Sequence, residues 1–177
     1  MTYKIISTFD GSTETCSLSE LSQQLKLNSI LCELNGNGTL IDSWPLVHGT
    51  LVTFAVEFAD YALLNYSKQK LPEAEDCITL TRKWLENHDS VSNEELTAAA
   101  YAAANAAYAA AAAYAAANAA AAAADAAADA ADAADAAYAA ANAAYAADAA
   151  ARIAGKNREA ELIRQGQFIV GYLRSCH

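Results

Sequence analysis

Residues 98–151 read AAAYAAANAAYAAAAAYAAANAAAAAADAAADAADAADAAYAAANAAYAADAAA, and 41 of these 54 residues are alanine. Alanine is the best helix former, and neither glycine nor proline interrupts the tract, so it predicts helix throughout. At 1.5 Å per residue, one unbroken helix would extend for about 81 Å. That is too long to pack against the remainder of a 177-residue chain. We therefore expect the tract to break.

The few side chains other than alanine indicate where the breaks fall. At 100° per residue, the side chains from Tyr101 to Tyr108 share one helical face, whereas those from Tyr114 to Asp132 share another. One straight helix with a single wet side would not change face in this way. Two or three helices, broken near residues 109–113 and 132–136, would account for it. Their alanine faces would let neighbouring helices approach closely.

Two shorter helices are predicted before the tract. Apolar residues recur at helical spacing from Leu51 to Leu63, and Pro72 ends this helix and starts the next, which extends to about Glu86. Residues 92–95 then form a capping-box pattern that opens the alanine-rich helix. After the tract, residues 151–177 carry five cations and two glutamates, net +3. They predict a final helix that is interrupted or softened at three glycines: Gly155, Gly166 and Gly171.

The first 45 residues predict a mixed element. Residues 3–9 are rich in β-formers, and a second capping-box pattern, Ser17 to Glu20, predicts a short helix through about Lys26. Residues 30–41, with Asn-Gly-Asn-Gly at the centre, predict a hairpin. Leu18, Leu21 and Leu25, with Leu27 beside them, also fit the first helix of a helix-turn-helix DNA-binding motif. Two lysines and no arginine in this segment are too few to hold DNA phosphates.

Together these segments predict a mainly α fold. We expect an alanine-rich helical bundle over residues 46–177, with the tract broken into two or three helices. Residues 1–45 would form a small mixed α/β element at the N-terminus.

Composition excludes several classes of protein. The net charge of −10 disfavours nucleic acid and anionic membranes as ligands, and five aspartates in the tract disfavour a membrane span. The start of the chain has no signal-peptide pattern. Four cysteines without metal-ligand spacing are expected to be reduced thiols in a cytoplasmic protein, with the last near the chain end and exposed: Cys16, Cys32, Cys77 and Cys176.

From Phe54 onward the order of segments resembles the Imm-5-like family of immunity proteins, which has bacterial and phage members. The resemblance rests on residues 54–63, on Pro72 before residues 77–85, and on residues 90–95 before the alanine tract. It covers about residues 51–173, and it implies a non-enzymatic inhibitor that neutralises a toxin or a host-defence enzyme by binding it. The chain departs from the family pattern because its tract has no arginine or histidine.

No catalytic constellation is evident. The three histidines have no partners at metal-ligand spacing, and the sequence has no phosphate loop or nucleophile motif. We expect no enzyme activity, no cofactor and no metal site. The aspartates of the tract line a helix face but would need oxygen ligands from a second helix to hold a cation. A solvated acidic stripe is the expected state.

That stripe is the predicted site for a protein partner with a basic surface. It comprises four aspartates with tyrosines on either side: Asp125, Asp129, Asp132, Asp135, Tyr114 and Tyr138. Tyrosine anchors interfaces at low entropic cost, and no cation in the tract neutralises the carboxylates. Alternatives are docking of the basic tail on the same stripe, a weak DNA mimic, or a module that sequesters a nucleotide-like signal between helices. The oligomeric state is left open.

Overall fold

The computed structural model describes residues 1–66, 70–109 and 157–176. Four antiparallel strands form a sheet in the order β2-β1-β3-β4. Their bounds are Thr2–Ser7 (β1), Thr13–Cys16 (β2), Ser29–Leu34 (β3) and Leu40–Leu46 (β4). The expected hairpin is confirmed as β3 and β4, and the side chain of Asn35 accepts hydrogen bonds from the amides of Asn37 and Thr39 in its turn.

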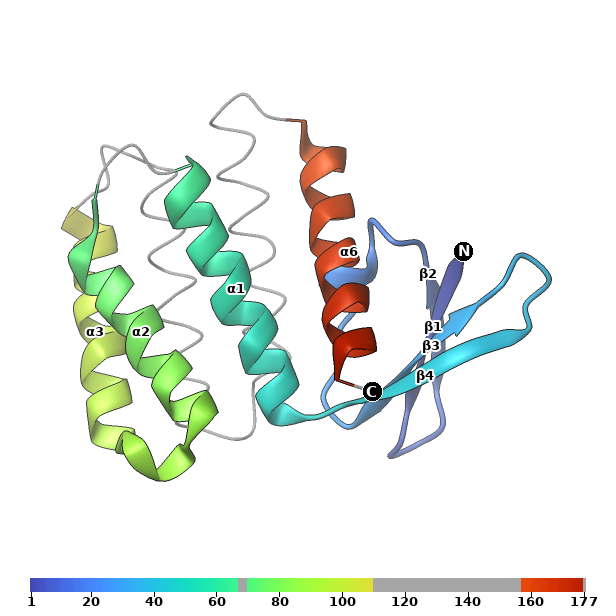
Figure 1. Ribbon diagram of the computed structural model, residues 1–177, viewed down its shortest axis with the longest axis horizontal. Helices are drawn as coiled ribbons and strands as arrows, with labels where there is room; N and C mark the ends of the chain where they lie inside the picture. The colour runs from blue at the N-terminus through green and yellow to red at the C-terminus, as the bar shows by residue number, and fades with distance from the viewer. Residues whose placement is uncertain (67–69, 110–156, 177) are drawn as a thin grey trace.

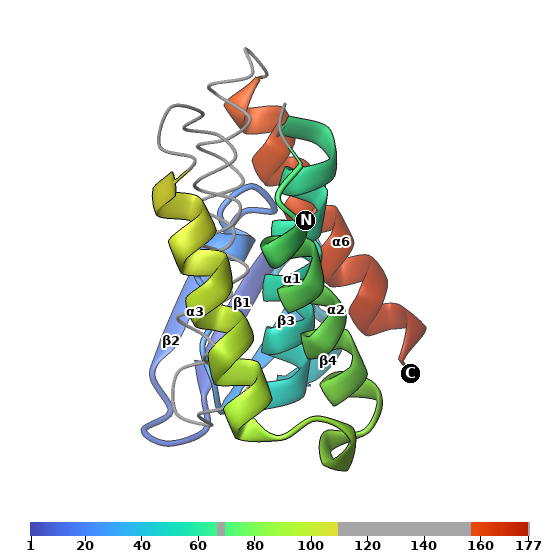
Figure 2. The same cartoon turned by 90° about the vertical axis from the view of Figure 1, so that its left-hand side faces the viewer.

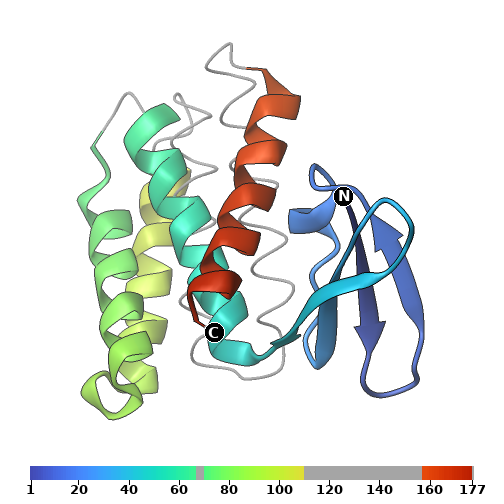
Figure 3. The same cartoon turned by 45° about the vertical axis from the view of Figure 1, so that its right-hand side comes forward.

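The helices lie on one face of this sheet (Figures 1 and 3). They are α1 (His48–Tyr66), α2 (Pro72–Glu86), α3 (Asn93–Ala109) and α6 (Arg158–Ser175). Short 3-10 turns occur at Leu21–Gln23 (η1) and His88–Ser90 (η2). Figure 2 shows α2 and α3 side by side, with the sheet on the far side of the helical layer. The predicted helices at residues 51–63 and 72–86 are confirmed, including the start at Pro72.

The prediction of a helical bundle with a small N-terminal element is wrong. In the described chain the sheet is a substantial layer, so the fold combines helices with a four-stranded antiparallel sheet. The expected helix from Ser17 is a single 3-10 turn, although its capping contacts form: the Ser17 amide and hydroxyl both donate to Glu20. Isolated short helices are marginal in water, and here packing prevails, because Leu21 and Leu25 are buried in the core.

The apolar core is shared by the sheet and the helices. Trp44 and Leu31 of the sheet and Phe54 and Phe58 of α1 are fully buried in one continuous cluster. The rings of Phe54 and Phe58 meet Phe168 of α6 nearly edge-on, with centroids 6.1 and 6.0 Å apart. The N-terminal sheet is therefore packed into the same core as the helices that follow it.

The C-terminal helix is continuous across Gly166 and Gly171, so neither glycine interrupts it. Gly166 has a different role. A Cβ atom there would collide with the backbone carbonyl oxygen of Leu18, whereas Gly171 has open space. Next to this close approach, the Ser22 hydroxyl donates to Gln165 over 2.8 Å, and Gln165 donates to Glu161. Gly166 lets α6 approach the backbone of the segment that precedes η1. Gly155 and the expected breaks in the alanine tract lie outside the described residues.

Candidate functional site

The predicted partner site, Asp125, Asp129, Asp132 and Asp135 with Tyr114 and Tyr138, lies entirely outside the described residues. Its arrangement therefore stays a prediction. The described start of the tract, residues 98–109, forms the later part of α3. Two adjoining hollows of about 410 and 330 Å³ lie along this helix and share Ala98. We call their combined lining the acidic groove. It consists of residues from α2 and α3: Glu73, Asp76, Leu80, Asn93, Glu94, Glu95, Thr97, Ala98, Ala99, Tyr101 and Ala102.

Short side chains create the hollow. Ala98 and Ala102 are exposed on the outer side of α3, while Ala100 and Ala103 are buried on its inner side. Leu80 of α2 is half-buried and supplies the apolar part of the floor. Because methyl groups project so little, the carboxylates beside them are left as a raised rim.

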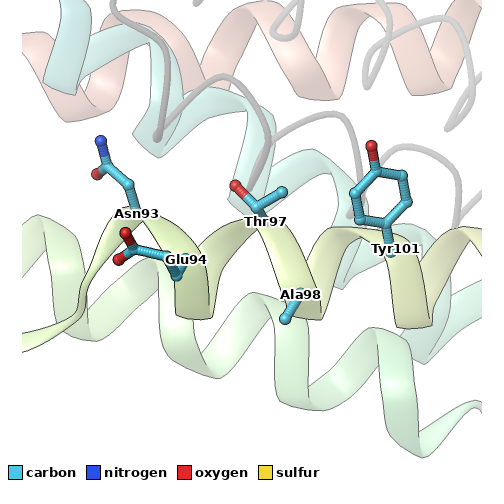
Figure 4. Close-up of a pocket in the computed structure, with 5 residues that line it drawn as sticks. All are labelled: Asn93, Glu94, Thr97, Ala98 and Tyr101. Carbon is cyan, nitrogen blue, oxygen red and sulfur yellow. The ribbon is translucent and has the colours of Figure 1, made fainter.

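Tyr101 stands out from this surface. Its side chain is 70% exposed, although a large aromatic residue contributes most when it is covered. Figure 4 shows Asn93, Thr97 and Tyr101 projecting from one side of α3, at intervals of one helical turn. An exposed tyrosine with polar neighbours at helical spacing is suited to contact a partner, because its ring is rigid and its hydroxyl can hydrogen-bond.

Three of the four carboxylates of the acidic groove lie near the N-terminus of a helix. Glu73 lies one residue after Pro72 at the start of α2, and Glu94 and Glu95 lie in the first turn of α3. The partial positive charge of a helix N-terminus stabilises carboxylates there. Pairing α2 with α3 then brings these two acidic starts to one groove. The local requirement for helix caps thus also makes an acidic surface.

Glu95 has an additional role as a cap. The predicted capping box is confirmed: the Ser92 amide and hydroxyl donate to the Glu95 carboxylate over 2.8 and 3.0 Å, and the Glu95 amide donates to the Ser92 hydroxyl. The hydrogen bond from the Ser92 amide, followed by that from its hydroxyl, lowers the pKa of Glu95. The carboxylate is therefore ionised over a wider range of pH than an ordinary glutamate.

Among the described residues, no lysine or arginine lines the acidic groove. Arg82 of α2 instead pairs with two carboxylates of α1, Glu57 and Asp60, each at 2.7 Å. The two acids of α1 thus share one cation within the fold, while the carboxylates of the groove face solvent. This contrast separates carboxylates that hold helices together from carboxylates that are available to an external cation.

The histidines form no metal centre in the described part of the chain, where no cluster of potential ligands is found. His88 stacks on Trp84 with centroids 4.2 Å apart, and His48 meets the same ring edge-on at 5.6 Å. None of the four cysteines, all of which lie in the described residues, forms a disulfide; Cys176 is exposed, as expected, and the others are buried. Burial raises the pKa of Cys77 to about 12, so this thiol has little nucleophilic character.

Sequence reasoning placed the acidic site farther along the tract and missed the groove. The α3 side of the groove could have been recognised in the sequence. Glu94, Ala98 and Tyr101 follow one another at spacings of four and three residues, which places them on one helix face. The α2 side could not have been recognised, because only the tertiary packing of α2 against α3 brings Glu73 and Asp76 next to these α3 residues.

Compared with known proteins, the chain matches no protein-family model, no curated protein and no solved structure. The similarity to the Imm-5-like family therefore stays a prediction. Among the described helices, none is long and apolar enough to cross a membrane.

Proposed function

We propose that this chain is a non-enzymatic inhibitor, similar to an immunity protein, that neutralises a protein partner by binding it. The partner would be a toxin or a host-defence enzyme with a basic surface, as the Imm-5-like resemblance implies. One observation carries the proposal: the acidic groove combines four exposed carboxylates with the exposed ring of Tyr101, and none of the described residues that line it is a cation.

Each part of the groove has a task in this proposal. The rim carboxylates attract a basic surface and accelerate the encounter, since complementary charge acts mainly on association rates. Tyr101 anchors the complex, and the alanine floor admits a lysine or arginine stem without a steric clash. The predicted aspartate stripe of residues 125–135 would extend the negative surface along the same tract. A phosphate-bearing ligand fits less well, because the rim repels anions.

The chain offers a matched test. Glu73, Glu94 and Glu159 each occupy the second position of a helix, α2, α3 and α6 respectively, but only the first two line the groove. The experiment first captures a partner on the immobilised wild-type chain. It then measures association with the double variant Glu73→Gln/Glu94→Gln and with the control Glu159→Gln.

We expect the double variant to associate more slowly, by about tenfold at low salt and less at high salt. Its melting temperature should fall no more per substitution than that of the control, because all three positions have the same helix-dipole environment. Equal binding by wild type and the double variant would contradict the proposal, as would equal weakening by the control.

A further inference from the structure

The acidic groove differs between its ends and its middle. Because α2 ends at Glu86 and α3 begins at Asn93 after a short connection, the two helices run antiparallel, side by side (Figure 2). Glu73 and Asp76, in the first half of α2, therefore lie toward one end of the groove. Glu95, in the first turn of α3, lies toward the opposite end. The groove thus carries carboxylates at both ends.

The middle of the groove is apolar. Leu80 of α2 is half-buried there, and α3 contributes three alanines, of which Ala99 is half-buried and Ala98 and Ala102 are exposed. Along this part of α3, the described lining therefore contains nothing longer than a methyl group. The groove is a shallow apolar trough between two charged ends.

Backbone hydrogen bonding decides the conformation of a segment that occupies this trough. Along the sides of α2 and α3, the backbone N–H and C=O groups are bonded within each helix and offer nothing to a neighbour. An extended segment laid in the trough would lose water from its own backbone groups without gaining partners, which costs free energy. A helix bonds its backbone internally, and alanine side chains let a neighbouring helix approach to about 8 Å. The trough therefore suits a third helix.

The carboxylates determine which side chains that helix must carry. Glu73 lies two turns before Leu80 in α2, and Glu95 lies two turns before Ala102 in α3, about 10 Å in each case. Because the helices are antiparallel, the acids at opposite ends are about 10–15 Å apart. A lysine or arginine at each end of the contact face of the bound helix, two to three turns apart, complements them, with apolar residues between. None of the described residues that line the groove is a cation that already pairs with these acids.

We propose that the acidic groove binds an amphipathic α-helix of the partner, with apolar residues at the centre of its contact face and a lysine or arginine at each end. This inference rests on the proposed function, which gives the groove a basic partner, and it adds the conformation and the residue pattern of the segment that binds. Binding of a helix in a groove depends on side chains at helical spacing. The affinity should therefore depend on where the cations stand, and not only on how many there are.

The test measures binding of two fluorescent peptides to the full chain by fluorescence anisotropy at low salt. Each peptide is an alanine- and glutamine-rich helix of about 20 residues. The first has an arginine, leucines about four and seven positions later, and a second arginine about eleven positions later, all on one face. The second peptide exchanges the arginines with the leucines, so it has the same composition and net charge. We expect the first peptide to bind at least about tenfold more tightly. Circular dichroism verifies that both peptides are helical.

Two neighbouring glutamates provide matched variants. Glu73 and Glu75 both lie in the first turn of α2 and are exposed, but only Glu73 lines the groove. Glu73→Gln should weaken binding of the first peptide by at least about threefold, and Glu75→Gln should leave it nearly unchanged. Equal affinity of the wild-type chain for the two peptides overturns the inference, as does the absence of binding at about 1 mM. Equal weakening by both variants overturns it as well, because it would show attraction by net charge alone.

The helix inference and the proposed function can fail separately. The captured partner may not be replaced by a peptide: if it associates more slowly with Glu73→Gln/Glu94→Gln while the two peptides bind equally, only the helix inference is overturned, and the groove contacts a partner surface of another conformation. If the double variant binds the captured partner as wild type does, the proposed function is contradicted whatever the peptide affinities are.

Discussion

Two pairs of helices in this molecule are joined in different ways. Between α1 and α6 the contact is aromatic: Phe54 lies edge-on to Phe168 and Tyr172, with centroids 6.1 and 5.6 Å apart. Between α2 and α3 the small side chains of α3 allow the two backbones to approach closely along their length. Rings fill the space between helices and close the surface above it. Alanines bring helices together and leave a hollow above them, so the same residue type makes both a tight interface and the acidic groove.

The aromatic contact between α1 and α6 should lose more stability on substitution than the contact between α2 and α3. Phe54→Ala removes a fully buried ring and leaves a cavity between α1 and α6. We expect the free energy of unfolding to fall by about 3–5 kcal/mol. Urea denaturation measures the change. A loss below about 1 kcal/mol would mean that α6 is not held by its aromatic contacts.

The next largest loss of stability is expected where α6 comes close to the backbone of the segment that precedes η1. Gly166→Ala places a methyl group against the Leu18 carbonyl, and we expect a loss of about 1–3 kcal/mol, near the upper end of that range because backbone must move. Gly171→Ala is the control in the same helix. It meets open space and should stabilise the protein by up to about 1 kcal/mol through helix propensity. Similar thermal shifts for both variants would rule out the steric explanation.

The two sides of α3 should respond differently to the same substitution. Ala103 is fully buried, so Ala103→Leu forces neighbouring helices apart and should cost about 1–3 kcal/mol. Ala102→Leu adds the same atoms on the exposed side and should leave stability almost unchanged. Because Ala102 lines the acidic groove, the second variant should nevertheless weaken partner binding. Equal melting temperatures for the two variants would show that the inner face of α3 is not packed.

The smallest effect concerns the cap of α3. The hydrogen bonds from Ser92 lower the pKa of Glu95, so the stabilisation is complete above the ordinary glutamate pKa and is lost as pH falls through the lowered value. Ser92→Ala should cost about 0.5–2 kcal/mol at neutral pH and make stability less sensitive to acid.

Ser17→Ala is the comparison for this cap, because it disrupts the same motif before a single 3-10 turn. Melting temperatures of the two variants, measured from neutral to acidic pH, compare the contributions of the two caps. The Ser92 amide stays in place in Ser92→Ala, so an unchanged acid dependence would contradict a contribution of the Ser92 hydroxyl to the ionisation of Glu95.

The helices could be predicted from the sequence because their signals are local. Pro72 and the Ser92–Glu95 box fix helix starts, and the apolar spacing from Leu51 to Leu63 is that of a buried helix face. The same pattern gave a wrong prediction at Ser17. The capping contacts form there, but Leu21 and Leu25 are buried in the core and the segment makes a 3-10 turn in place of an α-helix.

The sheet was underestimated for a physical reason. β2 has no strongly apolar residue other than a cysteine, and β3 carries a glutamate on its inner side. The partner that makes this glutamate acceptable, Arg174, lies 141 residues away in the sequence. Patterns within a short window cannot reveal such a pair. The acidic groove shows the same limit, since the α3 half has a helical period and the α2 half is brought to it by tertiary packing.

The central claim is that the acidic groove, and not another surface, contacts the partner. The most direct measurement is photo-crosslinking with p-benzoylphenylalanine in place of Tyr101 or, separately, in place of Phe9, which is 95% exposed in the turn between β1 and β2. The account predicts a covalent adduct with the captured partner from position 101 and none from position 9. An adduct from position 9 alone would contradict it.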